Sequence, residues 1–185
     1  MKKKTANLIM VLIIAAIVIA GVAVAFTLKT DTGDGLGSQY KIQKIKDNAL
    51  IEPGQEDNIC TITIVCDTIL DNTKNLNEEK APFVPKDGTI LPKTQVSFSE
   101  GDTVFEVLNK VCEAAGIQIE YSYTPMYESY YIEGINHLYE FDCGPESGWM
   151  YKVNDWFPNY GCSRYQLQDG DVVEWEYTCE LGKDI

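Results

Sequence analysis

The feature that most constrains this chain is a long apolar segment near its N-terminus, residues 8–28, which contains no charged side chain. As a helix rising about 1.5 Å per residue, it would be about 31 Å long, close to the roughly 30 Å of a bilayer's hydrocarbon core. Lys2, Lys3 and Lys4 precede it, and basic residues stay on the cytoplasmic side. The sequence therefore predicts a single-pass transmembrane helix in residues 1–28, with the rest of the chain outside the cell membrane.

A cleaved signal peptide is the alternative reading of the same segment. Ala23-Val24-Ala25 has the small-x-small pattern of a signal-peptidase site, so cleavage after Ala25 would release the domain. The apolar run is longer than the usual signal core of about 7–15 residues, which favours an uncleaved anchor. Both readings export the remainder of the chain.

Cysteine usage agrees with export, because an even number of cysteines in a small extracellular domain is typical of a disulfide framework. The sequence does not select the pairing. A bridge between Cys143 and Cys162, which flank an aromatic segment, is one hypothesis. Zinc binding is disfavoured because no clustered ligand spacing occurs and His137 is the single histidine, so no metal site is predicted. The six candidates for disulfide formation are Cys60, Cys66, Cys112, Cys143, Cys162 and Cys179.

The charge balance excludes one class of partner. The chain has 28 acidic and 15 basic residues, a net charge of −13, and three of those basic residues lie before the membrane segment. A surface this acidic repels nucleic acid. We therefore expect no nucleic-acid binding.

The exported part divides into a linker and one domain. Residues 29–58 are rich in Gly, Asp and Thr and are predicted to be a flexible linker, while residues 59–185 are long enough for one core. Alternating apolar positions predict strands over 59–66, 94–98, 117–123, 130–138, 148–154 and 172–179. Apolar residues at helical spacing predict one helix after Asp102 or Thr103, ended by Gly116. The expected class is α+β, with one helix covering a mixed sheet.

Two segments resemble the frame of a β-grasp domain, VSFSEGDTVFEVLNKVCEAAGI at 96–117 and LQDGDVVEWEY at 167–177. Residues 60–72 and 131–184 resemble the DUF4430 family, a domain of exported bacterial proteins that is similar to the C-terminal β-domain of transcobalamin and intrinsic factor. The resemblance lies in Gly148-Trp149-Met150-Tyr151, Val153-Asn154, Phe157-Pro158, Gly161, Tyr165, Asp169-Gly170-Asp171 and Trp175. It implies a β-grasp-like fold that binds a soluble ligand, with cobalamin as a possible ligand. The helical half of those vitamin carriers is absent here.

The candidate binding residues are aromatic and lie between Cys143 and Tyr165. Aromatic side chains on Gly- and Pro-bounded loops can form a rigid, amphipathic surface. Trp156, Phe157 and Tyr160 fall in a predicted loop, which favours exposure. Trp149 and Tyr151 are further candidates, although strand alternation favours the core for both. A second aromatic run, between Tyr121 and Tyr139, reads more readily as structural.

No catalytic apparatus is recognisable, because any Ser-His-Asp or Cys-His site would have to use His137. We expect neither enzymatic activity nor a required cofactor. The leading function is a membrane-tethered extracellular module that binds cobalamin or a similar corrinoid-like small molecule. The alternative is a cell-surface domain that binds another surface protein through the same aromatic residues and takes no small ligand.

Overall fold

The computed structural model describes residues 48–51 and 58–185. These residues belong to one compact unit, Lys41–Ile185. The predicted membrane segment 8–28, with its cleavage position at Ala25, lies outside the described residues. Within the described ranges, no helix is long and apolar enough to cross a bilayer.

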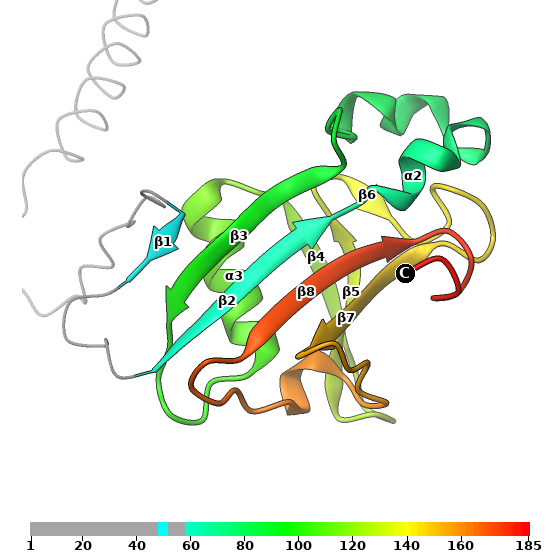
Figure 1. The fold of residues 1–185 in the computed structure, drawn as a ribbon. Helices are drawn as coiled ribbons and strands as arrows, with labels where there is room; N and C mark the ends of the chain where they lie inside the picture. Colours follow the sequence, from blue (N-terminus) through cyan, green and yellow to red (C-terminus); the bar gives the residue numbers. More distant parts are fainter. Residues whose placement is uncertain (1–47, 52–57) are drawn as a thin grey trace, which may run out of the picture. The chain divides into compact units, whose positions relative to one another are not determined.

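The larger of two sheets has five strands in the order β1-β3-β2-β8-β7 (Figure 1). Strand β2 pairs antiparallel with β3 and parallel with β8, and β7 pairs antiparallel with β8. Residues on β2, β7 and β8 alternate between buried and half-buried, as expected for strands with one face on the core. The strands are β1 (Ala49–Leu50), β2 (Ile59–Val65), β3 (Thr89–Ser97), β7 (Gly148–Val153) and β8 (Val172–Thr178).

Helix α3 (Val104–Ala115) covers the inner face of this sheet (Figure 1). It begins at a capping box, in which the Thr103 backbone N–H donates to Glu106 Oε2 over 2.8 Å. It ends at Gly116, whose φ of 69° suits the left-handed conformation that terminates many helices. Its buried side chains recur at helical spacing and form the centre of the core: Val104, Phe105, Val107, Leu108, Val111 and Cys112.

A second, three-stranded sheet lies behind β7 and β8 in Figure 1, in the order β4-β5-β6. Its strands are β4 (Ile119–Thr124), β5 (Ser129–Ile135) and β6 (Leu138–Tyr139). The Trp149 indole Nε1 donates to the Leu138 carbonyl over 2.8 Å, which ties β7 to this sheet. The core therefore lies between the larger sheet on one side and α3 with the smaller sheet on the other.

Four short helical pieces complete the domain. Three of them connect β2 to β3: α2 (Thr68–Asp71), η1 (Thr73–Asn75) and η2 (Glu78–Phe83). The connection ends at Gly88, which packs against Asp67. This position requires glycine, because its φ is 71° and a Cβ there would lie 2.4 Å from the Asp67 Cα. The fourth piece, η3 (Cys162–Arg164), packs near the other end of the larger sheet.

The predicted α+β class, with a mixed sheet and a covering helix, is confirmed. Two details differ from the sequence prediction. Part of the predicted linker 29–58 joins the sheet, because Ala49–Leu50 pairs parallel with Gln95 and Val96 and Leu50 is buried. A strand of two residues is too short to show an alternation of apolar and polar residues in the sequence. The segment after β2, for which the sequence predicts neither a strand nor a helix, forms short helical turns, and the Asn77 side chain caps one of them.

Candidate functional site

Strand β7 places two of the predicted binding residues in the core. Trp149 and Tyr151 alternate with half-buried neighbours and point inward, where each is less than a tenth exposed. The Trp149 ring meets Tyr177 edge-on with centroids 5.3 Å apart, and the Tyr151 ring lies 5.4 Å from that of Trp175. The prediction that Trp149 and Tyr151 contact a ligand is corrected, because their rings are buried beneath other side chains.

Tyr151 instead supports the loop that follows. Its hydroxyl donates a hydrogen bond of 2.8 Å to the Tyr160 carbonyl oxygen. Burial raises the pKa of Tyr151 well above its usual value, so the hydroxyl keeps its proton and remains a donor. The inward-facing Tyr151 side chain thus fixes the position of Tyr160.

A tight turn fixes the start of the same loop. Asn154 and Asp155 both have positive φ, 52° and 61°, which short polar side chains tolerate in two-residue hairpin turns. Val153 and Trp156 exchange backbone hydrogen bonds of 2.9 and 3.0 Å across the turn. The Asn154 amide then donates to Asp171 Oδ1 over 2.7 Å, and its Oδ1 accepts from the Val172 N–H over 2.9 Å. Trp156 is therefore presented from a turn anchored to the start of β8.

The predicted trio of Trp156, Phe157 and Tyr160 is only partly brought together. Trp156 and Tyr160 have ring centroids 6.1 Å apart, and Tyr160 stacks on Tyr165 at 6.2 Å. Trp156 is 51% exposed and Tyr160 is 38% exposed. Phe157 departs from this row, because its ring lies 6.0 Å from Lys152 Nζ on the outward face of β7. Trp156 and Tyr160 form one surface with the edge of Tyr165, and Phe157 belongs to another.

The second aromatic run joins this surface through η3. Ser163 Oγ lies 2.9 Å from Ser129 Oγ and accepts the Tyr130 N–H over 3.1 Å, so η3 packs against the end of the β4–β5 hairpin. Gly161 makes the approach possible, since a Cβ there would lie 2.0 Å from Ser129 Oγ. Residues far apart in the chain therefore meet at this end of the domain.

Around Tyr130 the rings are partly core and partly exposed. Tyr130 stacks on Phe105 with centroids 4.2 Å apart, and the rings of Tyr121 and Tyr123 meet Tyr130 edge-on at 5.3 and 5.5 Å. Phe105 is buried, whereas Tyr121 and Tyr123 are about half exposed. The structural reading of this run thus holds for Tyr130, while its neighbours face outward.

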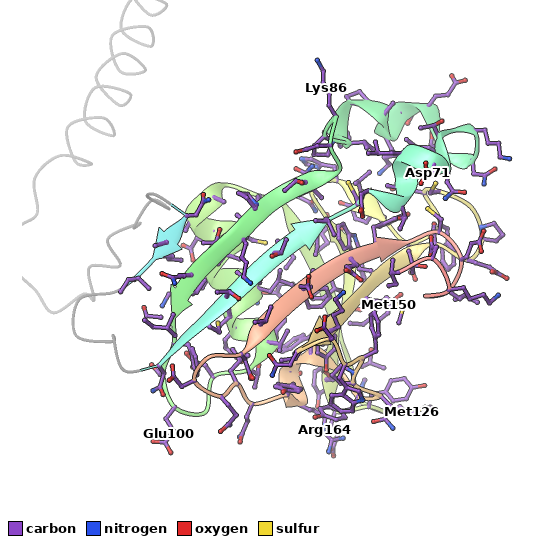
Figure 2. The ribbon with its side chains drawn as sticks, in the orientation of Figure 1. Asp71, Lys86, Glu100, Met126, Met150 and Arg164 are labelled. Carbon is purple, nitrogen blue, oxygen red and sulfur yellow. The ribbon has the colours of Figure 1, made fainter. Side chains whose placement is uncertain are left out.

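We call the exposed residues gathered around η3 the aromatic end. Met126 and Arg164, which Figure 2 labels, lie at this end of the molecule. The sequence predicts only its Trp156 and Tyr160 members as binding residues. Four other members come from the β4–β5 hairpin and Arg164 comes from η3, and no sequence signal records the contact between that hairpin and η3. The aromatic end consists of Tyr121, Tyr123, Met126, Tyr127, Trp156, Tyr160 and Arg164.

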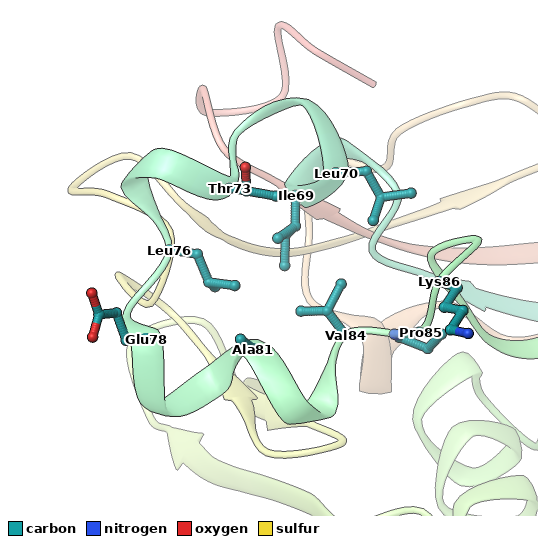
Figure 3. Close-up of a pocket in the computed structure, with 9 residues that line it drawn as sticks. All are labelled: Ile69, Leu70, Thr73, Leu76, Glu78, Ala81, Val84, Pro85 and Lys86. Carbon is teal, nitrogen blue, oxygen red and sulfur yellow. The ribbon is translucent and has the colours of Figure 1, made fainter.

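A cavity of about 330 Å³ lies elsewhere, within the connection between β2 and β3 (Figure 3). Ile69 and Leu70 on α2 form one wall, and Ala81 and Val84 form the facing wall. Glu78 and Lys86 stand at opposite ends of the opening in Figure 3. Sequence reasoning missed this cavity, because the apolar residues of this segment are scattered among Asn, Asp and Glu. None of Trp156, Phe157 and Tyr160 lines it.

The structure also places the groups on which metal binding or catalysis would depend. Over residues 48–51 and 58–185, no group of three His, Cys, Asp or Glu side chains is arranged to hold a metal ion. His137 is exposed in the turn between β5 and β6, with its ring 4.5 Å from that of Phe83. Within the same ranges no hydroxyl or thiol is hydrogen-bonded to its ring. The absence of catalysis stays a prediction.

The predicted Cys143–Cys162 bridge is corrected. Cys143 precedes the first residue of β7 and Cys162 follows the last, so the strand separates them. A six-residue strand is about 17 Å long, and a disulfide requires Cα atoms within about 7 Å. Cys143 Sγ instead lies 3.5 Å from the Asn72 carbonyl, and Cys162 Sγ lies 3.5 Å from the Tyr130 carbonyl.

Comparisons with known proteins give a family match without a function. Residues 101–179 match the model of a domain of unknown function, DUF4430. Among proteins of curated function, none is significantly similar to this chain. One solved structure, a candidate metal-binding protein from Ruminococcus gnavus, is 12% identical with a TM-score of 0.41. The match covers 66% of this chain and 97% of that one. A likeness this low carries no argument about function.

The Tyr151 hydroxyl provides a test of how the loop is held. In Tyr151→Phe the Tyr160 carbonyl loses the donor of a part-buried hydrogen bond, so the free energy of unfolding should fall by about 1 kcal/mol. Amide hydrogen exchange over residues 156–161 should also become faster. Tyr160→Phe is the matched control, because it keeps the carbonyl and the ring and removes only an exposed hydroxyl. Equal losses in both variants would contradict this account.

Proposed function

We propose that this domain is an extracellular protein-interaction module whose contact surface is the aromatic end. The observation that carries the proposal is the exposure of Trp156 and Tyr160 from a loop fixed by the core. Tyr, Trp, Met and Arg are the residues enriched at the centres of protein interfaces, and they account for every member of the aromatic end. Of the two functions considered from the sequence, protein binding is the better supported.

The rigidity of the loop adds to this support. Trp156 leaves a turn anchored to β8, and Tyr160 is held by Tyr151, so little conformational entropy is lost when a partner covers the two rings. The acidic charge of the domain favours a partner with a basic rim, because opposite charges steer association. The partner class is therefore a surface protein with an apolar centre surrounded by Lys or Arg.

The strand arrangement supports the β-grasp assignment. In that frame a β-hairpin is followed by a helix, and the last strand lies parallel to the first in the middle of the sheet. Here β2 and β3 form the antiparallel pair, α3 follows, and β8 lies parallel beside β2. The likeness to the transcobalamin β-domain is part of this proposal and rests on sequence resemblance alone.

Binding of a small molecule is the second candidate, favoured by the cavity in the connection between β2 and β3. Its volume of about 330 Å³ is near the lower limit of ligand pockets, which run from about 300 to 1,000 Å³. Its mainly apolar walls favour a small apolar ligand, and Lys86 at the opening favours an anionic group. Cobalamin is much larger than this cavity. Neither the matching family model nor the similar solved structure is described as binding a corrinoid, so cobalamin serves only as one probe.

The proposal also includes the membrane tether. The basic residues before segment 8–28 and the length of that segment support a single-pass anchor that keeps the domain outside the cell. When the full chain is expressed in bacteria, it should remain in the membrane pellet after alkaline carbonate extraction. Its N-terminal peptide should be detected intact by mass spectrometry. A mature N-terminus at Phe26 would contradict the anchor and establish release after Ala25.

Partner binding is tested by cross-linking at the aromatic end. A photoreactive amino acid at Asn159, an exposed neighbour of Tyr160, should yield a protein adduct of defined mass when the full chain is displayed on cells. Trp156→Ala should weaken the interaction about 30-fold, as expected for a hot-spot residue worth about 2 kcal/mol.

Phe141→Ala is the matched control, because Phe141 is 63% exposed but lies outside the aromatic end. Equal adduct yields from the wild type and Trp156→Ala would contradict the proposal. Adducts lost equally in Trp156→Ala and Phe141→Ala would show nonspecific hydrophobic capture.

The cavity is tested with 1-anilinonaphthalene-8-sulfonate, an apolar probe with one anionic group. The wild-type chain should enhance the fluorescence of this dye, and Ala81→Leu should abolish most of the enhancement by filling the cavity. Glu113→Leu, on the exposed face of α3, adds the same side chain away from the cavity and should retain it. Calorimetry with cobalamin should give no heat. Equal enhancement in both variants, or a heat with cobalamin, would contradict this assignment.

A further inference from the structure

Two cysteines meet at the end of the larger sheet opposite the aromatic end. Cys179 directly follows β8, and Cys143 lies in the loop that leads into β7. The register of the two strands pairs Gly148 with Thr178, which brings this loop beside the end of β8. Both thiols are buried, Cys143 almost completely.

The contacts of the two sulfur atoms converge on one helical turn. Cys143 Sγ lies 3.5 Å from the Asn72 carbonyl oxygen, and Cys179 Sγ lies 3.7 Å from Thr68 Oγ1. Thr68 begins α2 and Asn72 caps its C-terminus, and a hydrogen bond of 2.9 Å from Asn72 Nδ2 to the Thr68 carbonyl joins them. Each thiol also influences the pKa of the other, as neighbouring sulfur atoms do.

The backbone on both sides of this contact is already fixed. The Cys143 N–H donates to Ser147 Oγ over 3.1 Å, and the Tyr177 hydroxyl lies 3.0 Å from the same oxygen. The Cys179 N–H donates to Asp184 Oδ2 over 2.8 Å. Burial alone would raise the pKa of Asp184, but hydrogen bonds from Thr178 and Cys179 lower it, so this carboxylate is ionised at neutral pH. These hydrogen bonds hold both cysteines at the shared end of β7 and β8.

We propose that Cys143 and Cys179 form a disulfide in the exported protein. The S–S bond forms by thiol–disulfide exchange with an oxidised partner of the thiol-oxidase or glutathione-disulfide class. One thiolate attacks the partner's disulfide and releases a thiol, and the second thiolate then displaces the partner from the mixed disulfide. The two cysteines lose two electrons and two protons, and the partner is reduced to two thiols.

The order of events follows from burial. Burial raises the pKa of Cys143 to about 12 and also raises that of Cys179, so the reactive thiolate is scarce once the domain is folded. The bond therefore closes while the chain is folding, before α2 covers the two sulfur atoms. Once formed, it links the end of β8 to the loop before β7 beneath α2.

Cys66 is the third thiol near this point and the competing partner. It lies at the start of the turn into α2 and is fully buried. Its charge interaction also reaches Cys179, but among the described residues its sulfur makes no hydrogen bond to Thr68 or Asn72, the two residues on which the contacts of Cys143 and Cys179 converge. A Cys66–Cys179 linkage is therefore an outcome of the experiment that would overturn the proposal.

The experiment uses the full chain in detergent, refolded from denaturant in a buffer of reduced and oxidised glutathione. This buffer tests the pairing without assuming the exported location on which the inference rests. After free thiols are blocked with iodoacetamide, proteolysis without reductant and mass spectrometry should yield one peptide pair joining Cys143 to Cys179. Blocked Cys143 and Cys179, or either one joined to another cysteine, would overturn the proposal.

Thermal unfolding supplies a second readout. Reduction with dithiothreitol should lower the Tm of the wild type by roughly 10 °C, a typical loss for one native disulfide. Cys143→Ser and Cys179→Ser should each remove that dependence on reductant. Cys112→Ser, a matched buried cysteine on α3, should keep it. If a variant fails to fold, the wild-type peptide map decides alone, because it requires no substitution.

Discussion

The pairing of β7 with β8 positions both ends of this domain. Its register runs from Gly148 opposite Thr178 to Val153 opposite Val173. Because side chains alternate along a strand, this register buries Trp149 and Tyr151 and leaves Lys152 outside with Glu174 and Glu176. A slip of one residue would put the lysine in the core. The same pairing sends the aromatic loop from one end of β7 and brings Cys143 to the other, so one hydrophobic constraint sets the place of both.

Exposed aromatic side chains are costly unless something is gained from them. At the aromatic end the cost is compounded, because Asn154 and Asp155 adopt positive φ and the backbone is tied to Asp171 and Tyr151. This turn and these polar contacts hold the two rings outward. That arrangement makes sense for a contact surface that must be ready before its partner arrives, since ordering it during association would consume binding energy.

Much of the fold follows from local sequence patterns. Alternation in 59–66 and 148–154 and the spacing of Val104, Leu108 and Val111 give strands and a helix close to the observed ones. The site is less predictable, because it depends on contacts between distant segments. Phe157 lies on a different face from Trp156 although the two are adjacent, and the hairpin tip meets η3 only through Ser129 and Ser163. Prediction of the thiol pairing fails for the same reason: the sequence favours Cys162 because it flanks the aromatic segment together with Cys143, whereas the strand register brings the loop of Cys143 beside Cys179.

The two candidate sites depend on different parts of the molecule. Helix α2 forms one wall of the cavity through Ile69 and Leu70, and its Thr68 and Asn72 contact the two thiols. The aromatic end lies at the opposite ends of the strands and on η3. Among the residues that the structure describes, neither these strand ends nor η3 makes a hydrogen bond to an α2 side chain. A covalent link beneath α2 would therefore stiffen the cavity wall and leave the presentation of Trp156 unchanged. Under the proposed function, oxidation and partner binding can then vary independently, because the disulfide and the contact surface lie at opposite ends of the larger sheet.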